Sequence, residues 1–405
     1  MAQPLEGVRV ADFTHVMAGP FATHFLSLLG AEVIKVEPPD GDHFRDYDKD
    51  PAYAGMSPAF IAANLGKKSV VIDLKQEPGR EIARQLVAVS DVVVENFRPG
   101  VMDRLGLGYE ACKALKPDLI YCSVSGYGQS GPRRDYPALD QIIQAACGLM
   151  SVNGRAEDPP LRVGFPVVDT YAGTLGALAI LSALVQRERT GVGSRIDLAM
   201  FDAAMVLLTS ALTPWLVAGK PFPRTGNLGY SREPTADCFE AADGQLVSLG
   251  VTRQPMFEAL CRAAGRPEWL ADPRFATPRA RNQPANAAAL KAELEALFRT
   301  RPGEEWERLL SAAGAPCALV RDIPQCCDVD QLATRSVIQP VAIEGLPQEL
   351  VRVLGLGFEL DGETTSMPPP PRLGAQTDEV LALLGHDEAA RASLRSAGVT
   401  APRSA

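Results

Sequence analysis

Residues 7–13 (GVRVADF), 20–30 (PFATHFLSLLG) and 31–37 (AEVIKVE) decide the fold class. The first and third segments are apolar runs of strand length. The middle segment is typical of a helix, because Pro20 suits a first helical position and Gly30 suits the residue after a helix end. The pattern therefore predicts a strand, a helix and a second strand in direct succession.

The same alternation continues to about residue 125. SVVIDL (69–74), DVVVENF (91–97) and DLIYCSVSG (118–126) are typical of strands, and PGREIARQLVAVS (78–90) is typical of a helix. Continuous apolar strands separated by helices favour a mostly parallel sheet that is covered on both faces. We therefore expect an α/β fold whose first domain is Rossmann-like.

Later segments predict more elements and a second, smaller α+β domain. A buried helix is expected at 138–150, further helices at 170–191 and 201–219, and a strand at SRIDLAM (194–200). A Pro-, Gly- and Arg-rich loop at 219–235 precedes a hairpin around Asp243-Gly244, helices follow to about 328, and strands return in QPVAIEG and VRVLGLGFEL. The expected divisions are a large domain at 1–200, a linker at 201–228, a small domain at 229–328, and a return linker with further large-domain sequence at 329–405.

Composition narrows the possible partners. The chain has 405 residues and a formal net charge of −9, so it repels polyanions, and neither nucleic acid nor a membrane is an expected partner. The N-terminus lacks the pattern of a signal peptide, and no apolar run suggests a membrane span, so we expect a cytoplasmic protein. The eight cysteines and four histidines show no metal-ligand spacing, and no metal is predicted.

Two short motifs resemble nucleotide-binding signatures but lack their context. GYGQSG (126–131) follows a strand, yet Pro132 and charged residues come next, where a dinucleotide fingerprint opens a helix. GKKS (66–69) lacks the upstream glycine of a phosphate loop, because position 61 is Ile61. Neither motif predicts a nucleotide site.

Asp169 stands in VGFPVVDTYAGTLG, after an apolar run and before a helix. By residue type it is typical of a helix N-cap, but the same position would keep a carboxylate ionised and able to attack an acyl carbon. Basic residues lie on loops after predicted strands, where open parallel sheets bind ligands. These are Lys67, Lys68, Lys75, Arg98 and Arg104, with Asn96 and Phe97 beside Arg98.

Taken together and in order, several motifs resemble the family III coenzyme A-transferases. This CaiB/BaiF group contains formyl-, carnitine- and benzylsuccinate-coenzyme A transferases and the 2-methylacyl-coenzyme A racemases. The motifs include LEGVRVADFTHVMAGPFAT, LGAEVIKVEPPDGD, KKSVVIDLK, VVVENFRPGVMDRLGLGYE, SGYGQSGP, DTYAG, RTGVGSRIDLAMFDA, GAPCALVRD and LGAQTDEVLALLG. The resemblance implies a large domain built from both chain ends, a small middle domain and an interlocked homodimer.

The resemblance also implies the chemistry. Asp169 would be the catalytic nucleophile, passing through an aspartyl anhydride and an aspartyl–coenzyme A thioester, with coenzyme A or acyl-coenzyme A as substrate and no permanently bound cofactor. The coenzyme A contacts carry over to His15, Met17, Ala18, Ile72, Lys75, Asn96, Phe97, Arg98 and Arg104. Substrate contacts carry over more weakly to Asp140 and to the loop residues Gly226, Asn227 and Gly229.

Two departures from the family pattern bear on specificity. Racemases carry a histidine where this chain has Leu139, and leucine cannot move a proton at the 2-carbon, so a 2-methylacyl-coenzyme A racemase is the disfavoured alternative. Pro38 and Pro137 stand where some formyl- and oxalate-type members carry basic residues, which argues against those two acids.

The expected function is therefore an acyl-coenzyme A:carboxylate coenzyme A-transferase. Its donor would be of the succinyl- or acetyl-coenzyme A type, and its acceptor a short di- or hydroxycarboxylic acid. A coenzyme A-binding protein without catalytic activity is the third alternative.

Overall fold

The computed structural model describes residues 3–53, 55–335, 337–362 and 367–403. The chain divides into two compact units. The larger unit comprises 1–150, 162–220 and 331–405, and the smaller comprises 151–161 and 221–330. The segment expected to be a linker, 201–228, is helical over most of its first half.

The larger unit is built on a six-stranded parallel sheet in the order β3-β2-β1-β4-β5-β6. Its strands are β1 (Arg9–Asp12), β2 (Glu32–Glu37), β3 (Lys68–Val71), β4 (Val92–Glu95), β5 (Ile120–Ser125) and β6 (Ser194–Ala199). The expectation of a parallel, Rossmann-like sheet is confirmed. The strand order reverses between β1 and β4, and ligands bind in the crevice at such a point in open α/β sheets.

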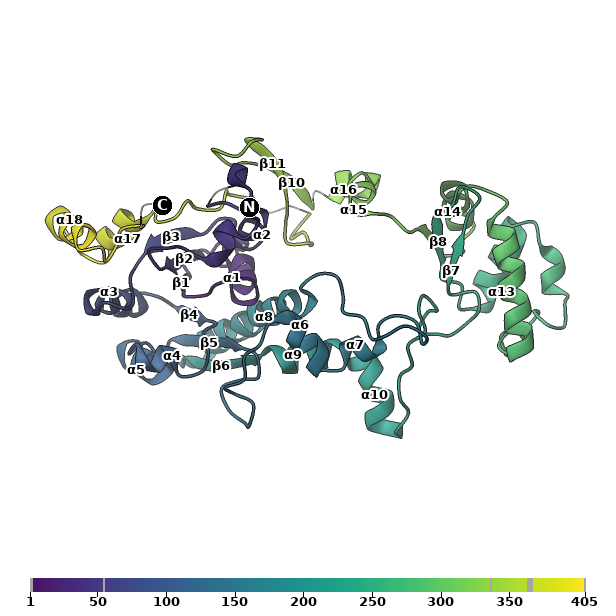
Figure 1. The fold of residues 1–405 in the computed structure, drawn as a ribbon, viewed down its shortest axis with the longest axis horizontal. Helices are drawn as coiled ribbons and strands as arrows, with labels where there is room; N and C mark the ends of the chain where they lie inside the picture. Colours follow the sequence, from purple (N-terminus) through teal and green to yellow (C-terminus); the bar gives the residue numbers. More distant parts are fainter. Residues whose placement is uncertain (1–2, 54, 336, 363–366, 404–405) are drawn as a thin grey trace. The chain divides into compact units, whose positions relative to one another are not determined.

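Helices cover both faces of this sheet, as Figure 1 shows. On one side lie α3 (Glu77–Ala88), α4 (Val101–Arg104), α5 (Tyr109–Leu115) and α17 (Thr377–Leu383), and on the other α1 (Ala18–Leu28) and α8 (Val167–Thr190). Residues of α3, α5 and α17 form one buried core with Phe13, Ile34 and Val93 of the strands and the loop after β1. Burial on both faces explains why inner strands such as β4 and β5 are fully buried, whereas β6 at the sheet edge has alternating exposed residues.

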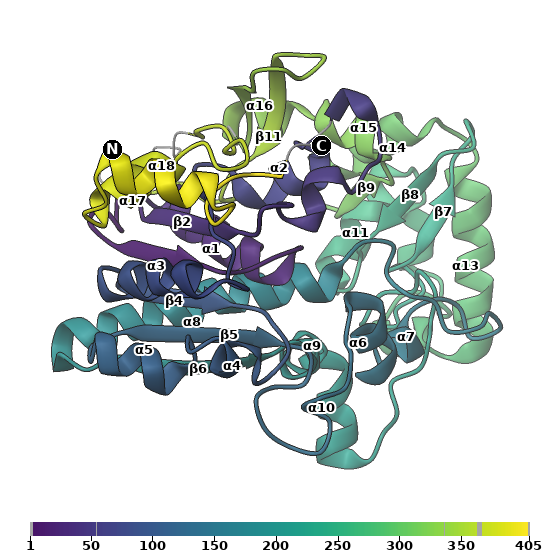
Figure 2. The same cartoon turned by 60° about the vertical axis from the view of Figure 1, so that its left-hand side comes forward.

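The C-terminal part of the chain returns to the larger unit. Helix α17 contacts β3 at the sheet edge, and α18 (Glu388–Ser396) follows it (Figure 2). An antiparallel hairpin, β10 (Ile338–Ala342) with β11 (Leu350–Leu354), follows α15 (Ile323–Cys327) and α16 (Asp330–Arg335). Three short helices lie between β2 and β3: η1 (His43–Asp46), η2 (Pro51–Tyr53) and α2 (Pro58–Asn64).

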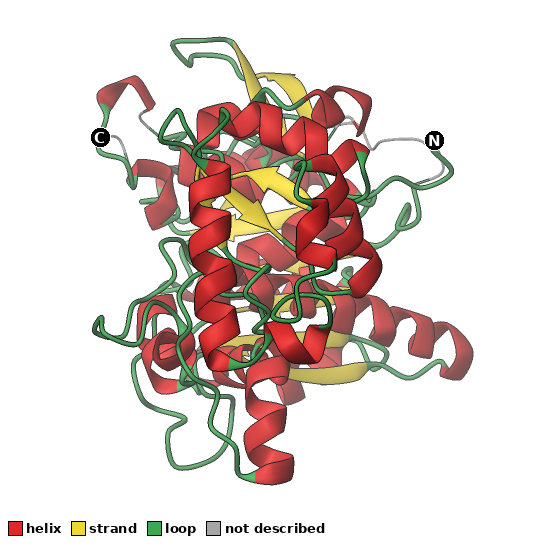
Figure 3. Ribbon diagram, turned by 90° about the vertical axis from the view of Figure 1, so that its right-hand side faces the viewer, coloured by secondary structure: helices red, strands yellow, loops and turns green. Residues whose placement is uncertain are grey.

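The smaller unit has a three-stranded antiparallel sheet in the order β7-β8-β9, among helices (Figure 3). Its strands are β7 (Cys238–Glu240), β8 (Leu246–Leu249) and β9 (Cys317–Leu319), and its helices include α11 (Gln254–Ala263), η3 (Pro267–Leu270), α12 (Pro278–Arg281), α13 (Pro284–Phe298) and α14 (Gly303–Ala312). The hairpin expected around Asp243-Gly244 is present, with Gly244 at a φ of 78°.

Two expected helices are each broken into two. Residues 138–150 form α6 (Asp140–Ala146) and α7 (Leu149–Val152), separated at Gly148 with a φ of 91°, a backbone conformation that glycine adopts readily. The segment is also not fully buried, because Ile142 is 44% exposed. Residues 201–219 form α9 (Met200–Leu207) and α10 (Thr209–Ala218), and these two helices are bent by 80° at their junction.

Helix α8 has the length and apolar composition that would suffice to cross a membrane, and so does the bent pair α9 and α10. Helix α8, however, packs along α1 and against β5 and β6. One face of α8, including Val168, Ile180 and Leu184, is therefore buried in the α/β unit, whereas Leu178 and Val185 are exposed.

Candidate active site

A cavity of about 240 Å³ lies at the carboxyl ends of β1, β4 and β5, where the strand order reverses. The loop after β1 contributes Val16 and Met17, and the loop after β4 contributes Asn96 to Pro99. Asp169, at the beginning of α8, lies in the wall of the same cavity. Of the residues expected to bind coenzyme A, the cavity brings together Met17, Ala18, Asn96, Phe97 and Arg98.

The loop after β1 is held by the side chain of Asn96. The backbone N–H of His15 donates to Asn96 Oδ1 at 2.8 Å, and Asn96 Nδ2 donates to the His15 carbonyl at 2.7 Å. Val16 has a φ of 69°, which is unusual for a β-branched residue, and its N–H donates to Asp42 Oδ1 at 3.2 Å. These bonds stabilise a strained loop that delivers Met17 to the cavity.

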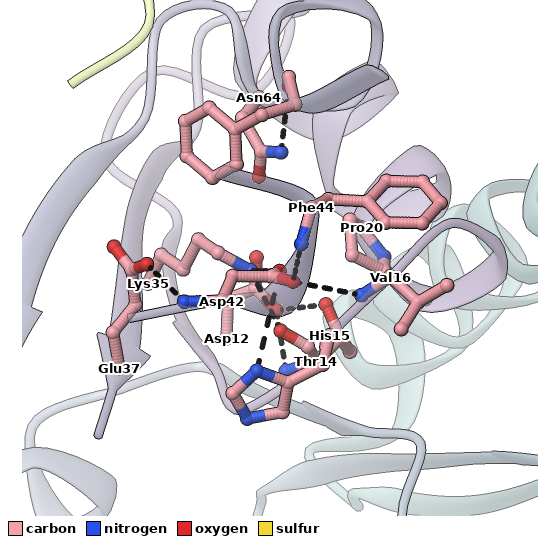
Figure 4. A network of polar contacts seen from close by, with 12 residues as sticks. Asp12, Thr14, His15, Val16, Pro20, Lys35, Glu37, Asp42, Phe44 and Asn64 are labelled. Atoms are coloured by element: carbon pink, nitrogen blue, oxygen red, sulfur yellow. Dashed lines mark hydrogen bonds and ion pairs between the residues drawn. The ribbon is translucent and has the colours of Figure 1, made fainter. Parts of the chain in front are cut away.

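Beneath this loop lies a network of buried charges (Figure 4). Lys35 lies 2.8 Å from Asp42 Oδ2 and also donates to the Thr14 carbonyl at 2.7 Å, while Lys67 lies 3.0 Å from Asp12 Oδ2. Burial by itself would raise the pKa of Asp12, but Lys67 and Lys35 outweigh burial and lower it. Since all these groups are deeply buried, each depends on its partner to stay charged.

His15 lies beside this network without taking part in an ion pair. Burial and the nearby Lys35 ammonium lower its pKa, so the ring is neutral at neutral pH even though Nδ1 is 4.0 Å from Asp42. Its ring packs edge-on against Phe97, with centroids 5.5 Å apart. His15 thus helps to join the loop after β1 to the loop after β4.

Asp169 is the third residue of α8, and the N-cap is Pro166. The expectation that Asp169 is itself the N-cap is therefore wrong. Burial, followed by the charge of Asp140, raises the pKa of Asp169 to about 7. Desolvation therefore opposes the ionisation that the helix terminus favours, and this carboxyl group loses its proton less readily than its position in the sequence predicts.

Asp140 supplies the cap that α8 lacks. Its Oδ2 accepts the backbone N–H of Val168 at 2.7 Å and that of Asp169 at 3.1 Å. Gln144 in turn donates to Asp140 Oδ1. Asp140 thus holds the end of the helix that carries Asp169.

Two arginines meet near Gly100, on the loop after β4. Arg104 Nη1 and Arg134 Nη2 lie 3.4 and 3.9 Å from the point where a Cβ on Gly100 would stand. Among the described residues Arg98 and Arg104 form no ion pair, and Arg134 is 3.5 Å from Asp135. Sequence reasoning missed Arg134, which also lines the cavity, although the Arg133-Arg134 pair just after a predicted strand was a usable signal.

The other expected basic and apolar contacts lie away from the cavity wall. Ile72 is buried in the sheet core, and Lys75 is exposed after β3. Lys67 is held by Asp12, and Lys68 by Glu32 and Glu379.

Position 139 lies in the wall of the cavity that Asp169 lines, and Leu139 is 62% exposed. A histidine here would share that cavity with Asp169, whereas leucine offers no group that accepts or donates a proton. The structure thus puts the difference from the racemases next to the nucleophile candidate.

The glycine loop lies in the smaller unit. Gly226, with a φ of 61°, and Asn227 line a polar cavity of about 530 Å³ together with Arg224 and Lys291. Gly229 donates its N–H to the Ala236 carbonyl at 2.6 Å. This cavity is lined entirely by residues of the smaller unit.

In the described parts of the chain, no three His, Cys, Asp or Glu side chains group as metal ligands.

Comparison with known proteins gives consistent results. The model of CoA-transferase family III matches residues 5–377. The acetyl-CoA:oxalate CoA-transferase of Acetobacter aceti is 41% identical over 354 residues, which cover 87% of this chain and 90% of that protein. The succinyl-CoA:glutarate CoA-transferase of Mus musculus is 34% identical, covering 98% of this chain and 90% of that protein. The crystal structure of a CaiB/BaiF family protein from Brucella suis has a TM-score of 0.83 and 32% identity, and covers 95% of this chain and 100% of that chain.

Proposed function

Because the chain belongs to CoA-transferase family III and is an acyl-CoA:carboxylate CoA-transferase, we propose that Asp169 carries the group being transferred. The observation that supports this proposal is the place of Asp169. It lines a cavity at the carboxyl ends of the parallel strands, together with Met17, Ala18 and Arg98. We also propose an interlocked homodimer in the cytoplasm.

The chemistry proceeds in balanced steps. An oxygen of the Asp169 carboxylate attacks the thioester carbonyl of the donor, the carbon–sulfur bond breaks, and the coenzyme A thiolate leaves. The thiolate then attacks the aspartyl carbonyl of the mixed anhydride, releasing the donor acid as a carboxylate and leaving an aspartyl thioester. The acceptor carboxylate reverses both steps, so covalent capture conserves the thioester energy.

The N-terminus of α1 faces the developing negative charge in this scheme. Met17 and Ala18, at the first turn of α1, line the cavity with Asp169. The first N–H groups of a helix have no partner within it, and the helix dipole favours negative charge there. They supply the oxyanion donors that acyl transfer needs.

We assign the binding of the coenzyme A phosphates to three arginines on and near the loop that holds Gly100. Arg98 lines the cavity, and Arg104 and Arg134 each have a guanidinium nitrogen close to Gly100. Guanidinium groups bind phosphate through paired hydrogen bonds. A Cβ at Gly100 would narrow this space, and its φ of 80° also disfavours any other residue.

The relatives suggest the range of acids. Two relatives act, by name, on oxalate with acetyl-CoA and on glutarate with succinyl-CoA. We accordingly propose a donor of the succinyl- or acetyl-CoA type and a short di- or hydroxycarboxylic acceptor. Leu139 at the cavity wall disfavours racemisation.

Trapping the covalent intermediate tests the proposal. The protein is mixed with acetyl-CoA or succinyl-CoA, quenched with hydroxylamine and digested, and mass spectrometry locates the hydroxamate. We expect modification of Asp169 alone. Asp169→Ala should bind coenzyme A without forming the adduct, and Asp48→Asn, which changes an exposed carboxylate of the same unit, should behave as wild type. An adduct on another carboxylate, or transfer by Asp169→Ala, would refute the assignment.

A further inference from the structure

A second cavity in the larger unit, of about 580 Å³, has a mostly apolar lining. Its walls come from α1, α2, the hairpin β10–β11 and the beginning of α8. Phe21 and Phe25 of α1, Ile61 of α2 and Val353 of β11 are among its lining residues. Its volume is within the range of small-molecule sites.

This cavity adjoins the one that Asp169 lines. Met17 is part of both walls. Asp169 lines the first cavity and Thr170, the next residue of α8, lines the second. The side chains of successive helical residues point about 100° apart, so Asp169 and Thr170 can line two different cavities from the same helix end. The two cavities thus share part of their wall at Met17 and at the first turn of α8.

The buried part of the cavity wall carries no charge. His24 is only 4% exposed and stacks on Phe21, and burial lowers its pKa to about 3, so its ring is neutral. Among the described residues that line the cavity, Arg352 is the only one with a charged side chain, and it is exposed on β11. An ionised carboxylate in the cavity would lose its hydration without a buried partner, which is costly.

We propose that this cavity is the acyl chamber of the enzyme and that one of its two acids has an uncharged, apolar chain of medium length. This inference rests on the proposed covalent role of Asp169 and extends the substrate class proposed above, because one of the two acids is then longer and more apolar than an acetyl, succinyl or short dicarboxylic group. A short acid also fits, but leaves the apolar walls in contact with water. Longer apolar chains bury more surface and so react faster.

The formation of aspartyl-coenzyme A in a single turnover tests the inference without an acceptor. Acetyl-, butyryl-, hexanoyl-, octanoyl- and glutaryl-CoA are compared by acid quench and mass spectrometry. Each buried methylene is worth about 0.8 kcal/mol, so the second-order rate constant should rise up to about fourfold per methylene until the chamber is full. Glutaryl-CoA should react more slowly than its uncharged counterparts.

Two variants test whether the dependence of the rate on chain length arises in this cavity. Ala62 lines the chamber from an exposed position on α2, so Ala62→Phe adds volume there with little risk to folding. It should lower the rate with octanoyl-CoA about tenfold relative to that with acetyl-CoA. Ala88→Phe makes the same change at an exposed site of α3, on the other side of the sheet, and should leave all rates at wild-type values. Binding of free coenzyme A shows that both variants are folded.

The possible contrary results distinguish failure of the acyl chamber from failure of the covalent mechanism. Rates that do not depend on chain length, or an equal loss for acetyl- and octanoyl-CoA in Ala62→Phe, overturn the chamber while transfer through Asp169 stands. A preference for glutaryl-CoA that disappears in Arg352→Ala shows that a diacid is the occupant and overturns the proposal. A changed oligomeric mass of Ala62→Phe in analytical ultracentrifugation points to a second copy in the cavity and overturns it too. If no donor yields aspartyl-coenzyme A, the covalent mechanism itself fails.

Discussion

The carboxylate of Asp140 accepts the backbone N–H of Asp169 at 3.1 Å, although the two residues are 29 positions apart in the sequence. The same oxygen accepts the N–H of Val168 at 2.7 Å. Asp140 thus fixes the end of α8, and its negative charge also helps to raise the pKa of Asp169. One side chain therefore both holds the helix end that carries the proposed nucleophile and opposes the ionisation of its carboxyl group.

Replacing Asp140 should separate these two effects. Asp140→Asn retains an oxygen for the N–H groups and removes the charge, so the acid limb of the rate profile should move to lower pH with little loss of kcat. Asp140→Ala also removes the charge, but it loses the cap, at about 1 kcal/mol of folding free energy, and should lower kcat at least tenfold. Profiles of both variants, with thermal melts, check this. An unchanged acid limb in both variants would show that the charge of Asp140 does not affect the pKa of Asp169.

The wild-type enzyme should lose activity in mild acid. Only the ionised carboxylate attacks the donor, and the pKa of Asp169 is about 7. The rate constant for aspartyl-coenzyme A formation should therefore fall about tenfold per pH unit below about pH 7 and level off above it. Coenzyme A binding measured by calorimetry at the same pH values separates ionisation of Asp169 from weaker binding. A flat rate profile from about pH 5.5 to 8 would contradict the assignment.

Asp169→Asn should abolish transfer and yet stabilise the protein. The pKa of Asp169 is about 7 in the folded protein against an ordinary 3.8, so the folded state binds more protons than the unfolded chain between these values. The free energy of unfolding contributed by this group falls as pH rises from about 4 to about 7, and the full penalty persists above that range. Asparagine carries no charge at either pH, so the variant does not have this free-energy penalty.

We expect Asp169→Asn to raise the free energy of unfolding at about pH 8 by about 1–2 kcal/mol, allowing for solvent relaxation around this half-buried side chain. At about pH 4 the difference should vanish. Denaturant titrations at both pH values measure it, with Asp48→Asn as the matched control. Equal effects at the two pH values would mean that the ionisation of Asp169 costs the fold nothing.

The arginines beside Gly100 should each contribute to coenzyme A affinity. Arg104→Ala and Arg134→Ala should each raise the Kd about tenfold, since each removes a charged hydrogen-bond donor to phosphate. Arg133→Ala removes the same charge from the neighbouring exposed residue and should have little effect. Repeating the titrations with 3′-dephospho-coenzyme A identifies the phosphate concerned. Equal losses in all three variants would indicate only a general charge effect.

Much of the sheet could be predicted because its strands are buried on both faces and are therefore continuous apolar runs, as in VVVE of β4. The hairpin at Asp243-Gly244 could be predicted from its turn residues. The breaks at Gly148 and Leu208 could not, because the apolar pattern continues across both.

The site could be predicted only in part. Motif resemblance pointed to Asp169, whereas residue type alone would have made it a cap. The partnership with Asp140 depends on a contact between distant segments that no local pattern encodes. Lys35 within the apolar run AEVIKVE was a visible anomaly, but its partner Asp42 belongs to a loop, so the buried pair could not be inferred.

In the described part of the chain, the strands of the hairpin β10–β11 pair only with each other and not with the six-stranded sheet. The hairpin can therefore vary in length and sequence without disturbing a ladder on which the fold depends. Because the hairpin lines the proposed acyl chamber and not the cavity of Asp169, replacing it with the equivalent hairpin of a relative should alter the choice of acid and leave the Asp169 cavity unchanged.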